Sequence, residues 1–201
     1  MRDQFRFLGL ASPVRRALDR EALSGIGRPG EHDMVSVATA CWDQPYREYQ
    51  YFACDYLTRH ASVTGPAFLD TARTLIVTKS WWDTVDVLAQ HVVGSLVARQ
   101  PSLVTVMDEW IVDDDIWLAR TAILHQNRAK AATDPMRLFR YCEFRAGDKE
   151  FFIRKAIGWA LREYSKTDAA AVRAFVDDHA ADLSGLSRTE ALKWLARRTP
   201  A

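Results

Sequence analysis

The strongest constraint on the fold of this chain is a helical pattern that recurs every 34 residues. Three helical segments align with one another when they are started at Asp86, Arg120 and Arg154. His91 and His125 are separated by the same interval. A period close to this length, built from pairs of short helices, is typical of solenoids of the HEAT-like or TPR-like kind. The TPR alternative is disfavoured because its glycine and alanine pattern is absent.

Nearly every segment has the 3.6-residue periodicity of an α-helix, and no stretch alternates convincingly with the two-residue period of a strand. Prolines, glycines and capping residues divide the chain into short helices. We predict helices at residues 12–23, 31–42, 45–60 and 64–78. A further helix starts at residue 81, a short one ends at about residue 112, and another starts at residue 113. The remaining helices follow the boundaries at Asp134-Pro135, Gly147-Asp148, Thr167-Asp168 and Ser187. The predicted fold is therefore all-α, a HEAT-like helical-repeat solenoid that forms one domain over residues 1–201.

The composition is that of an ordinary globular protein, with 48% hydrophobic and 26% charged residues. No apolar run approaches the roughly 18 residues of a membrane span, and the first residues lack the pattern of a signal peptide. We therefore expect a cytoplasmic protein of bacterial type that does not act at a membrane. The three cysteines lack the spacing of metal ligands, so we expect reduced thiols, no metal and no disulfide.

Basic residues are concentrated in one part of the chain. The formal net charge is only +1, which excludes nucleic-acid binding by bulk charge alone. Between Arg120 and Lys166, however, there are eleven basic and five acidic residues, which gives this segment a net charge of +6. One side of the molecule is therefore expected to be basic, unless these charges belong to ordinary solvated helix faces.

The stretch from Lys79 to Asp86 places two tryptophans and two carboxylates close together at a predicted helix start. Ser80 is predicted to be the N-cap, with Asp83 at the capping-box position three residues later. Trp82 and Asp86 then lie one turn apart and share a helix face. A large apolar ring beside an ionisable acid suits either a half-buried structural corner or a site for a cationic, ring-shaped ligand.

Several motifs along the chain carry a resemblance to a known family. These are Phe5-Arg6-Phe7-Leu8-Gly9-Leu10, Pro13-Val14-Arg15-Arg16, Trp42-Asp43, Arg47-Glu48-Tyr49-Gln50, Lys79-Ser80-Trp81-Trp82-Asp83-Thr84-Val85-Asp86, Trp117-Leu118-Ala119-Arg120 and Phe152-Ile153-Arg154-Lys155-Ala156-Ile157-Gly158-Trp159-Ala160-Leu161-Arg162. Over essentially the whole chain they resemble the AlkD-type DNA alkylation repair proteins, which are alkylpurine DNA glycosylases built from HEAT-like repeats. Members of that family usually carry a further helical segment before the first motif, so we expect either that this N-terminal helix is missing here or that the true start site lies upstream.

The resemblance implies a function and a site. It implies a monomer without a cofactor, associated with the nucleoid, that binds double-stranded DNA on a concave face and excises cationic bases such as N3-methyladenine and N7-methylguanine. In that family two tryptophans, an aspartate and an arginine form the active surface. The matching positions in this sequence are Trp82, Trp159, Asp86 and Arg120.

The chemistry of these residue types suits such a reaction. An alkylated purine is already cationic, so the leaving base needs little acid catalysis, and the main need is to stabilise an oxocarbenium-like sugar and to supply water. The carboxylate of Asp86 can do both. Trp82 and Trp159 offer aromatic faces to a cation, while Arg120 and Arg154 can bind backbone phosphates and fix the register of the DNA.

Each of these residues also has a simpler structural interpretation. Trp159 lies in an apolar-rich helix and would suit a hydrophobic core, and Asp86 would suit an ion pair with Arg120 across adjacent repeats. Trp81 and Asp83 are assigned to packing and to capping respectively. The alternative function is therefore a non-catalytic HEAT-like module that binds DNA or a protein along the same face.

Overall fold

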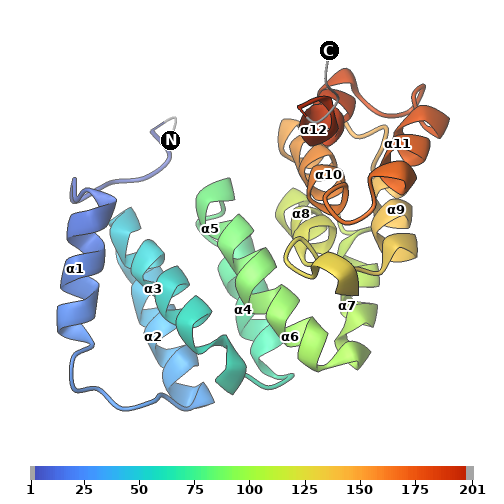
Figure 1. Ribbon diagram of the computed structural model, residues 1–201. Coiled ribbons are helices and arrows are strands. Elements are labelled where there is room, and N and C mark those ends of the chain that lie inside the picture. Colours follow the sequence, from blue (N-terminus) through green and yellow to red (C-terminus); the bar gives the residue numbers. More distant parts are fainter. Residues whose placement is uncertain (1–2, 198–201) are drawn as a thin grey trace. The chain divides into compact units, whose positions relative to one another are not determined.

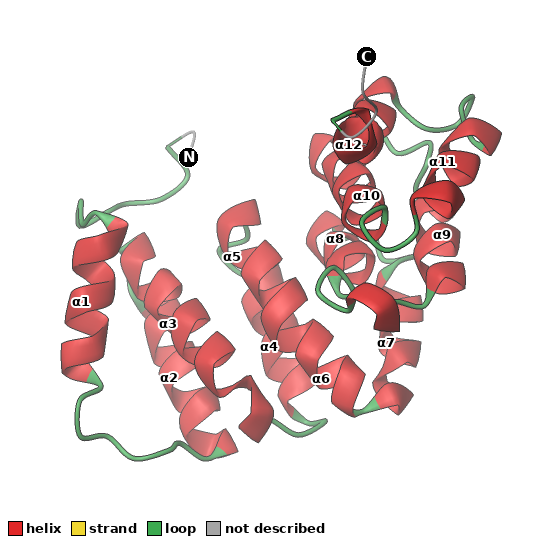
Figure 2. Cartoon of the chain, in the orientation of Figure 1, coloured by secondary structure: helices red, strands yellow, loops and turns green. Residues whose placement is uncertain are grey.

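The computed structural model describes residues 3–197, which form helices joined by short loops (Figures 1 and 2). Within this described part there is no strand, only an isolated bridge between Arg6 and Tyr46. The predicted all-α repeat fold is confirmed. Among residues 3–197, no helix has the length and apolar character needed to cross a bilayer.

The chain divides into two compact units, Met1–Arg99 and Gln100–Ala201. The first contains α1 (Ser12–Ala22), α2 (Glu31–Asp43), α3 (Arg47–His60), α4 (Phe68–Val77), α5 (Trp82–Val87) and α6 (Gly94–Arg99). The second contains α7 (Val104–Trp110), α8 (Ile116–Leu124), α9 (Pro135–Phe144), α10 (Phe151–Tyr164), α11 (Ala169–Asp178) and α12 (Gly185–Ala196). Short 3₁₀ turns at Ala61–Val63, Pro101–Leu103 and Lys130–Ala132 lie between some of these helices.

Helices α5 and α6 are two parts of one continuous helical run. The six residues Leu88–Val93 between them have π-helical hydrogen bonding. A π segment widens the helix locally, and such segments occur frequently at functional sites. Trp82 and Asp86 lie in the regular turn and a half that precedes this segment.

The core of the first unit lies between its helix pairs. α2 packs against α3 and α4, and α3 packs against α5. The fully buried side chains include Met34, Leu57, Phe68, Ile76 and Leu88. Burying each such side chain contributes about 1.5–3 kcal/mol, so packing between repeats rather than helix propensity stabilises these short helices.

Contacts between successive repeats preserve the interval seen in the sequence. In the first unit the Trp42 indole Nε1 donates to the Leu75 carbonyl at 3.1 Å, across a separation of 33 residues. In the second unit Arg145 Nε donates to the Ile111 carbonyl at 2.7 Å, across 34 residues. A side chain therefore reaches the equivalent region of the neighbouring repeat, as expected for a repeat protein in which each repeat contacts its neighbours.

The segment before α1 is held by one carboxylate of α3. Glu48 is buried, and its two oxygens accept the backbone N–H groups of Leu8, Gly9 and Leu10 at 2.9, 2.9 and 3.3 Å. Burial alone would raise the pKa of Glu48, but these backbone hydrogen bonds lower it overall. Gly9 has a φ of +85°, a conformation that glycine adopts without strain.

Most predicted helix boundaries are close to the observed ones, but the caps predicted at Ser12, Ser80 and Ser187 are wrong. Ser12 is the first residue of α1, and Ala11 is its N-cap. Ser80 is not an N-cap: Trp81 occupies that position without a side-chain cap, and Ser80 Oγ donates instead to the Ile76 carbonyl at 2.6 Å. Ser187 does not cap the last helix either. Ser184 does, since its Oγ accepts the Ser187 backbone N–H at 3.0 Å. The predicted cap at Asp168 is confirmed, and the predicted boundary at Asp134-Pro135 coincides with the N-cap Asp134.

Helix α10 packs closely against α8 and α12 in the second unit. The contact with α12 depends on Gly158. A Cβ at this position would lie 2.6 Å from the Glu190 Cβ and 2.8 Å from the Ser187 carbonyl oxygen. The absent side chain is therefore what allows the two helices to approach.

Replacing Gly158 with alanine is expected to lower the free energy of unfolding by about 1–3 kcal/mol, because the new methyl group collides with α12. Alanine's higher helix propensity opposes this loss by about 1 kcal/mol. Urea unfolding followed by circular dichroism measures the change. The matched control is Gly147→Ala, where a Cβ meets no atom within 4 Å; equal stability of the two variants would contradict the close-contact argument.

His125 is a buried histidine that stays neutral in the folded protein. Its Nδ1–H donates to the Ala122 carbonyl at 2.7 Å. Burial lowers the pKa of His125 from its ordinary 6.5 to about 4, and the hydrogen bond to Ala122 opposes this only partly.

This lowered pKa predicts a loss of stability in mild acid. The unfolded chain takes up a proton at His125 near pH 6.5 and the folded chain only near pH 4, so the stabilisation is complete above 6.5 and disappears as the pH falls. When the pH falls from 7.5 to 5.5, the free energy of unfolding is expected to decrease by about 1.4 kcal/mol because of His125. Burial also lowers the pKa of His60, so that histidine changes the stability in the same direction. The measurement is therefore urea unfolding of native protein and His125→Gln at both pH values; an equal pH dependence in both would refute this assignment.

Candidate nucleic-acid interface

Trp82 and Asp86 lie one turn apart on α5, in the first unit. The Trp82 side chain is unusually open for an indole, with 45% of its surface exposed. Asp86 is only 7% exposed. The pair therefore combines a solvent-accessible aromatic surface with a largely buried carboxylate on one helix.

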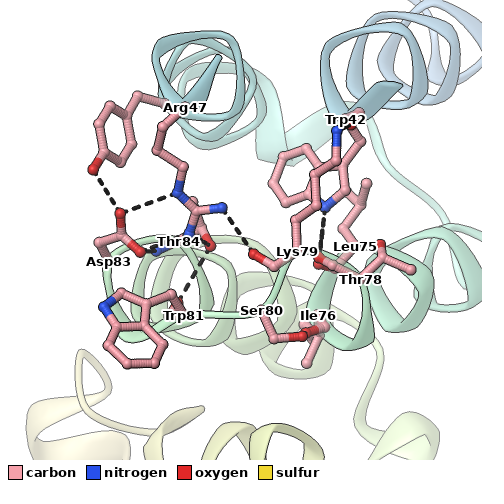
Figure 3. A network of polar contacts seen from close by, with 11 residues as sticks. Trp42, Arg47, Leu75, Ile76, Thr78, Lys79, Ser80, Trp81, Asp83 and Thr84 are labelled. Carbon is pink, nitrogen blue, oxygen red and sulfur yellow. Dashed lines mark hydrogen bonds and ion pairs between the residues drawn. The ribbon is translucent and has the colours of Figure 1, made fainter. Parts of the chain in front are cut away.

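The start of α5 is held by a buried arginine of α3 (Figure 3). Arg47 has no exposed surface. Its Nη2 donates to Asp83 Oδ1 at 2.6 Å and to Thr84 Oγ1 at 2.8 Å, and its Nε donates to Asp83 Oδ2 at 3.2 Å. Its Nη1 donates to the Lys79 carbonyl at 2.8 Å. One guanidinium therefore fixes both the turn before α5 and the first turn of the helix.

Lys79 occupies a strained position in that turn, with a φ of +49°. Residues other than glycine seldom adopt this conformation, and it persists only where surrounding contacts enforce it. Its carbonyl is bound by Arg47, and its Nζ donates to the carbonyls of Trp42 and Gln44, the latter at 2.8 Å. Both ends of Lys79 are thus held by the preceding repeat (Figure 3).

Asp83 has a different role from the predicted capping box. Ser80 is not the N-cap, so no reciprocal cap forms, and Asp83 instead accepts from Arg47 and from the Tyr51 hydroxyl at 2.6 Å. Burial, followed by the hydrogen bond to Asp83, raises the pKa of Tyr51. Tyr51 therefore remains a hydrogen-bond donor throughout the neutral range. The carboxylate of Asp83 is satisfied by the scaffold.

Arg120 lies on α8 in the second unit and is buried, with 4% of its surface exposed. Its Nη1 donates to the Phe152 carbonyl, and its guanidinium lies 6.0 Å from the centre of the Phe152 ring. Trp117 packs against the same ring at a centroid distance of 4.9 Å. Arg120 therefore connects α8 to the first turn of α10.

Arg154 and Trp159 both lie on α10 and are half-buried. The Arg154 carbonyl accepts from Ser187 Oγ at 3.0 Å, which joins α10 to α12. The Arg154 Nε is buried and has no hydrogen-bond partner among the described residues. A buried guanidinium N–H without an acceptor is costly, so this atom lowers the stability of the fold as it stands.

The five predicted site residues fall into two groups. Trp82 and Asp86 share one helix of the first unit, while Arg120, Arg154 and Trp159 lie on the packed pair α8 and α10 of the second. All five contribute to the proposal below. In the described part of the chain, no three His, Cys, Asp or Glu side chains gather closely enough to hold a metal ion.

Sequence reasoning gave no role to Arg47, although it lies within one of the motifs. A signal was available, because Arg47 precedes Asp83 by 36 residues, which is close to the repeat interval. A basic and an acidic residue one repeat apart are candidates for a contact between successive repeats.

This chain belongs to the DNA alkylation repair enzyme family, whose model matches residues 1–195. Among solved structures it is similar to a predicted DNA alkylation repair enzyme from Enterococcus faecalis. The two share 29% identity with a TM-score of 0.88, over 98% of this chain and 91% of that chain. No curated protein matches the chain.

Two structures from Streptococcus mutans share the fold at lower identity. The first, smu.31, has 16% identity and a TM-score of 0.67, over 89% of this chain and 92% of its own. The second, AlkD2, has 17% identity and a TM-score of 0.63, over 92% and 90% respectively. At these identities the similarity concerns the helical-repeat architecture.

Proposed function

We propose that this protein is a DNA glycosylase that excises cationic alkylated purines, such as N3-methyladenine and N7-methylguanine, from double-stranded DNA. The observation that carries the proposal is the pair on α5, in which a buried carboxylate lies one turn from an exposed indole. Membership in a family of DNA alkylation repair enzymes supports it.

In this mechanism Asp86 stabilises the sugar as the glycosidic bond breaks. The leaving base is cationic and departs neutral, while positive charge develops on the deoxyribose. A carboxylate within a low-dielectric environment stabilises such a charge more strongly than one in water. The same oxygen atoms can orient the water that completes hydrolysis of the bond.

The other residues of the proposed site bind the DNA. Trp82 offers an exposed ring to the lesion or its sugar, a contact worth about 0.5–2 kcal/mol for a cation. Trp159, half-buried on α10, offers a second aromatic ring. Arg120 and Arg154 bind backbone phosphates, which fixes the register of the DNA.

The direct test measures release of 7-methylguanine from duplex DNA alkylated with a methylating agent, as a function of protein concentration and time. We expect release of free base at neutral pH and the formation of alkali-labile abasic sites in equal amount. DNA binding without release of base above the spontaneous rate would refute the glycosylase proposal.

A non-catalytic binding module is the second candidate, and the burial of Arg120 favours it. A guanidinium that is 4% exposed and bound to the Phe152 carbonyl already has a structural role. Salt dependence distinguishes the kinds of partner. A DNA-binding surface predicts an affinity that falls steeply with salt concentration, whereas a protein-binding surface built from packed helices does not.

A further inference from the structure

A groove between α1 and α3 in the first unit is lined by charged side chains that the proposed site does not use. The two helices are in contact and lie side by side in Figure 1. Because the residues come from two separate helices, the fold rather than the local sequence brings their charges together. The lining of this α1–α3 groove includes Arg16, Asp19 and Arg20 of α1, and Asp55, Tyr56 and Arg59 of α3.

The two carboxylates of the α1–α3 groove already have cationic partners. Arg15 is buried, and its Nη1 and Nη2 lie 2.6 Å from Asp19 Oδ2 and 2.6 Å from Asp55 Oδ2 respectively. Arg16 Nε lies 3.6 Å from the same oxygen of Asp55. Two arginines therefore balance two aspartates, which leaves the other arginines of the groove without a carboxylate to neutralise them.

Arg20 and Arg59 carry the uncompensated charge. Both residues are exposed, and neither side chain makes an ion pair or a hydrogen bond with any residue between 3 and 197. Arg20 also lies one helical turn after Arg16, a spacing at which like charges repel each other and destabilise a helix. An anion bound in the groove would relieve that repulsion.

Positive charge extends from the groove to the turn that follows α3. Arg28 Nη2 donates to Ser62 Oγ at 3.3 Å, which places this arginine beside the turn at Ala61–Val63. Burial lowers the pKa of His60, and the charges of Arg59 and Arg28 lower it further. Both arginines therefore act on one side chain, as expected where positive charges gather.

We propose that the α1–α3 groove binds a phosphate group of the DNA backbone through Arg20 and Arg59. A guanidinium matches a phosphate with two parallel N–H···O bonds, and here one is supplied from each side of the groove. Such a contact fixes the protein on the duplex without reading its sequence. It presupposes the duplex DNA of the proposed function, and it adds α1 and α3 to the surface that binds this DNA.

DNA is favoured over a free anion because both arginines are exposed to solvent. Exposed charges bind a single small anion weakly, whereas a polyanion gains affinity from the release of counterions at every contact.

The contact is expected to affect binding and not chemistry. Arg47, which binds Asp83 of α5, and Arg59 lie at opposite ends of α3. At 1.5 Å per residue, the twelve residues between these positions correspond to about 18 Å along the helix. A lesion at Trp82 and Asp86 is therefore out of reach of Arg59.

The test compares DNA binding by native protein and by the double variant Arg20→Ala with Arg59→Ala, using fluorescence anisotropy at several salt concentrations. Each phosphate contact contributes about 0.9 to the slope of log affinity against log salt concentration, so the double variant is expected to lose about 1.8. At low salt its affinity is expected to fall about tenfold or more, equally for undamaged and alkylated duplexes, because the contact is to the backbone. Base release at saturating protein is expected to be unchanged.

Two control variants isolate the effect. Arg173→Ala, at an exposed arginine of α11 outside the groove, is expected to leave the salt dependence unchanged. Arg20→Lys with Arg59→Lys keeps both charges and is expected to keep most of the salt dependence, since lysine also binds phosphate. All substituted side chains are exposed, so native melting temperatures are expected throughout. Inorganic phosphate, added at constant ionic strength, is expected to leave DNA affinity unchanged.

Several results would overturn the proposal. They are an unchanged salt dependence in the double alanine variant, an equal loss in Arg173→Ala, a lysine variant as weak as the alanine variant, and the absence of DNA binding by native protein. A fall of native affinity to that of the double alanine variant in inorganic phosphate would also overturn it, by identifying a free anion as the ligand.

Failure of the proposed function gives a different result. If the double alanine variant loses the expected salt dependence but native protein releases no base, the glycosylase proposal fails and the groove contact stands. If native protein releases base and the salt dependence is unchanged in the variant, only the groove contact fails.

Discussion

The Asp86→Asn variant is expected to release 7-methylguanine from alkylated duplex DNA about 100-fold more slowly than the native protein, or slower still. Asparagine has nearly the same shape as aspartate but carries no charge. It can neither stabilise a positively charged sugar by Coulombic attraction nor accept a proton from water. Asp86 is 7% exposed, so the native charge acts in surroundings that screen it weakly.

The measurement is single-turnover release of base with protein in excess, so that chemistry is separated from binding. Affinity for the same DNA is expected to change little, since the loss falls on the transition state. Thermal unfolding of the variant controls for structural damage. A native release rate in a folded Asp86→Asn variant would remove Asp86 from the mechanism, whereas loss of both binding and stability would assign it to packing.

The second large effect concerns the arginine that holds the start of α5. Arg47→Ala is expected to lower the free energy of unfolding by about 3–5 kcal/mol, because it leaves the carboxylate of Asp83 buried without its cationic partner. It also removes the hydrogen bond to the carbonyl of Lys79, which has a left-handed conformation. Urea unfolding at neutral pH measures the loss.

A paired substitution separates the missing charge from the missing packing. Arg47→Met with Asp83→Leu removes both charges and keeps apolar volume, so it is expected to recover much of the stability. It does not restore the bond to the Lys79 carbonyl, so the turn before Trp82 remains less constrained. We expect the double variant to bind DNA more weakly than native protein. If it binds DNA with the affinity of the native protein, the constraint on this turn does not contribute to DNA binding.

The helices and their repeat were predictable because both depend on local signals. The periodicity of apolar residues, and the prolines and glycines that end helices, can be recognised from residues close together in the sequence. The interval between Asp86 and Arg120 follows directly from counting. Caps were less predictable. Ser184 and Ser187 are equally suited by type, and the choice between them depends on where α12 meets Arg154.

The interior contacts of the candidate site were not predictable from type and spacing alone. Asp83 looked like a helix-start acid, but the guanidinium of Arg47 comes from a helix one repeat earlier. Arg120 looked like a phosphate ligand, and the structure adds a bond to the Phe152 carbonyl that no sequence pattern indicates. Both contacts are made by side chains that reach from one repeat to the next. Between residues so far apart, the sequence shows only the repeat interval and not which groups meet.

The reach of these arginines has a consequence for engineering the chain. Arg47 and Arg120 each bind a carbonyl that lies 32 residues further on, at Lys79 and Phe152. A fragment cut anywhere within residues 47–79 or 120–152 would keep the arginine and lose its acceptor, leaving a buried cation without compensation. Circular permutants, truncations or grafts of this protein should therefore be cut outside these two ranges, so that each arginine and its carbonyl stay on the same piece.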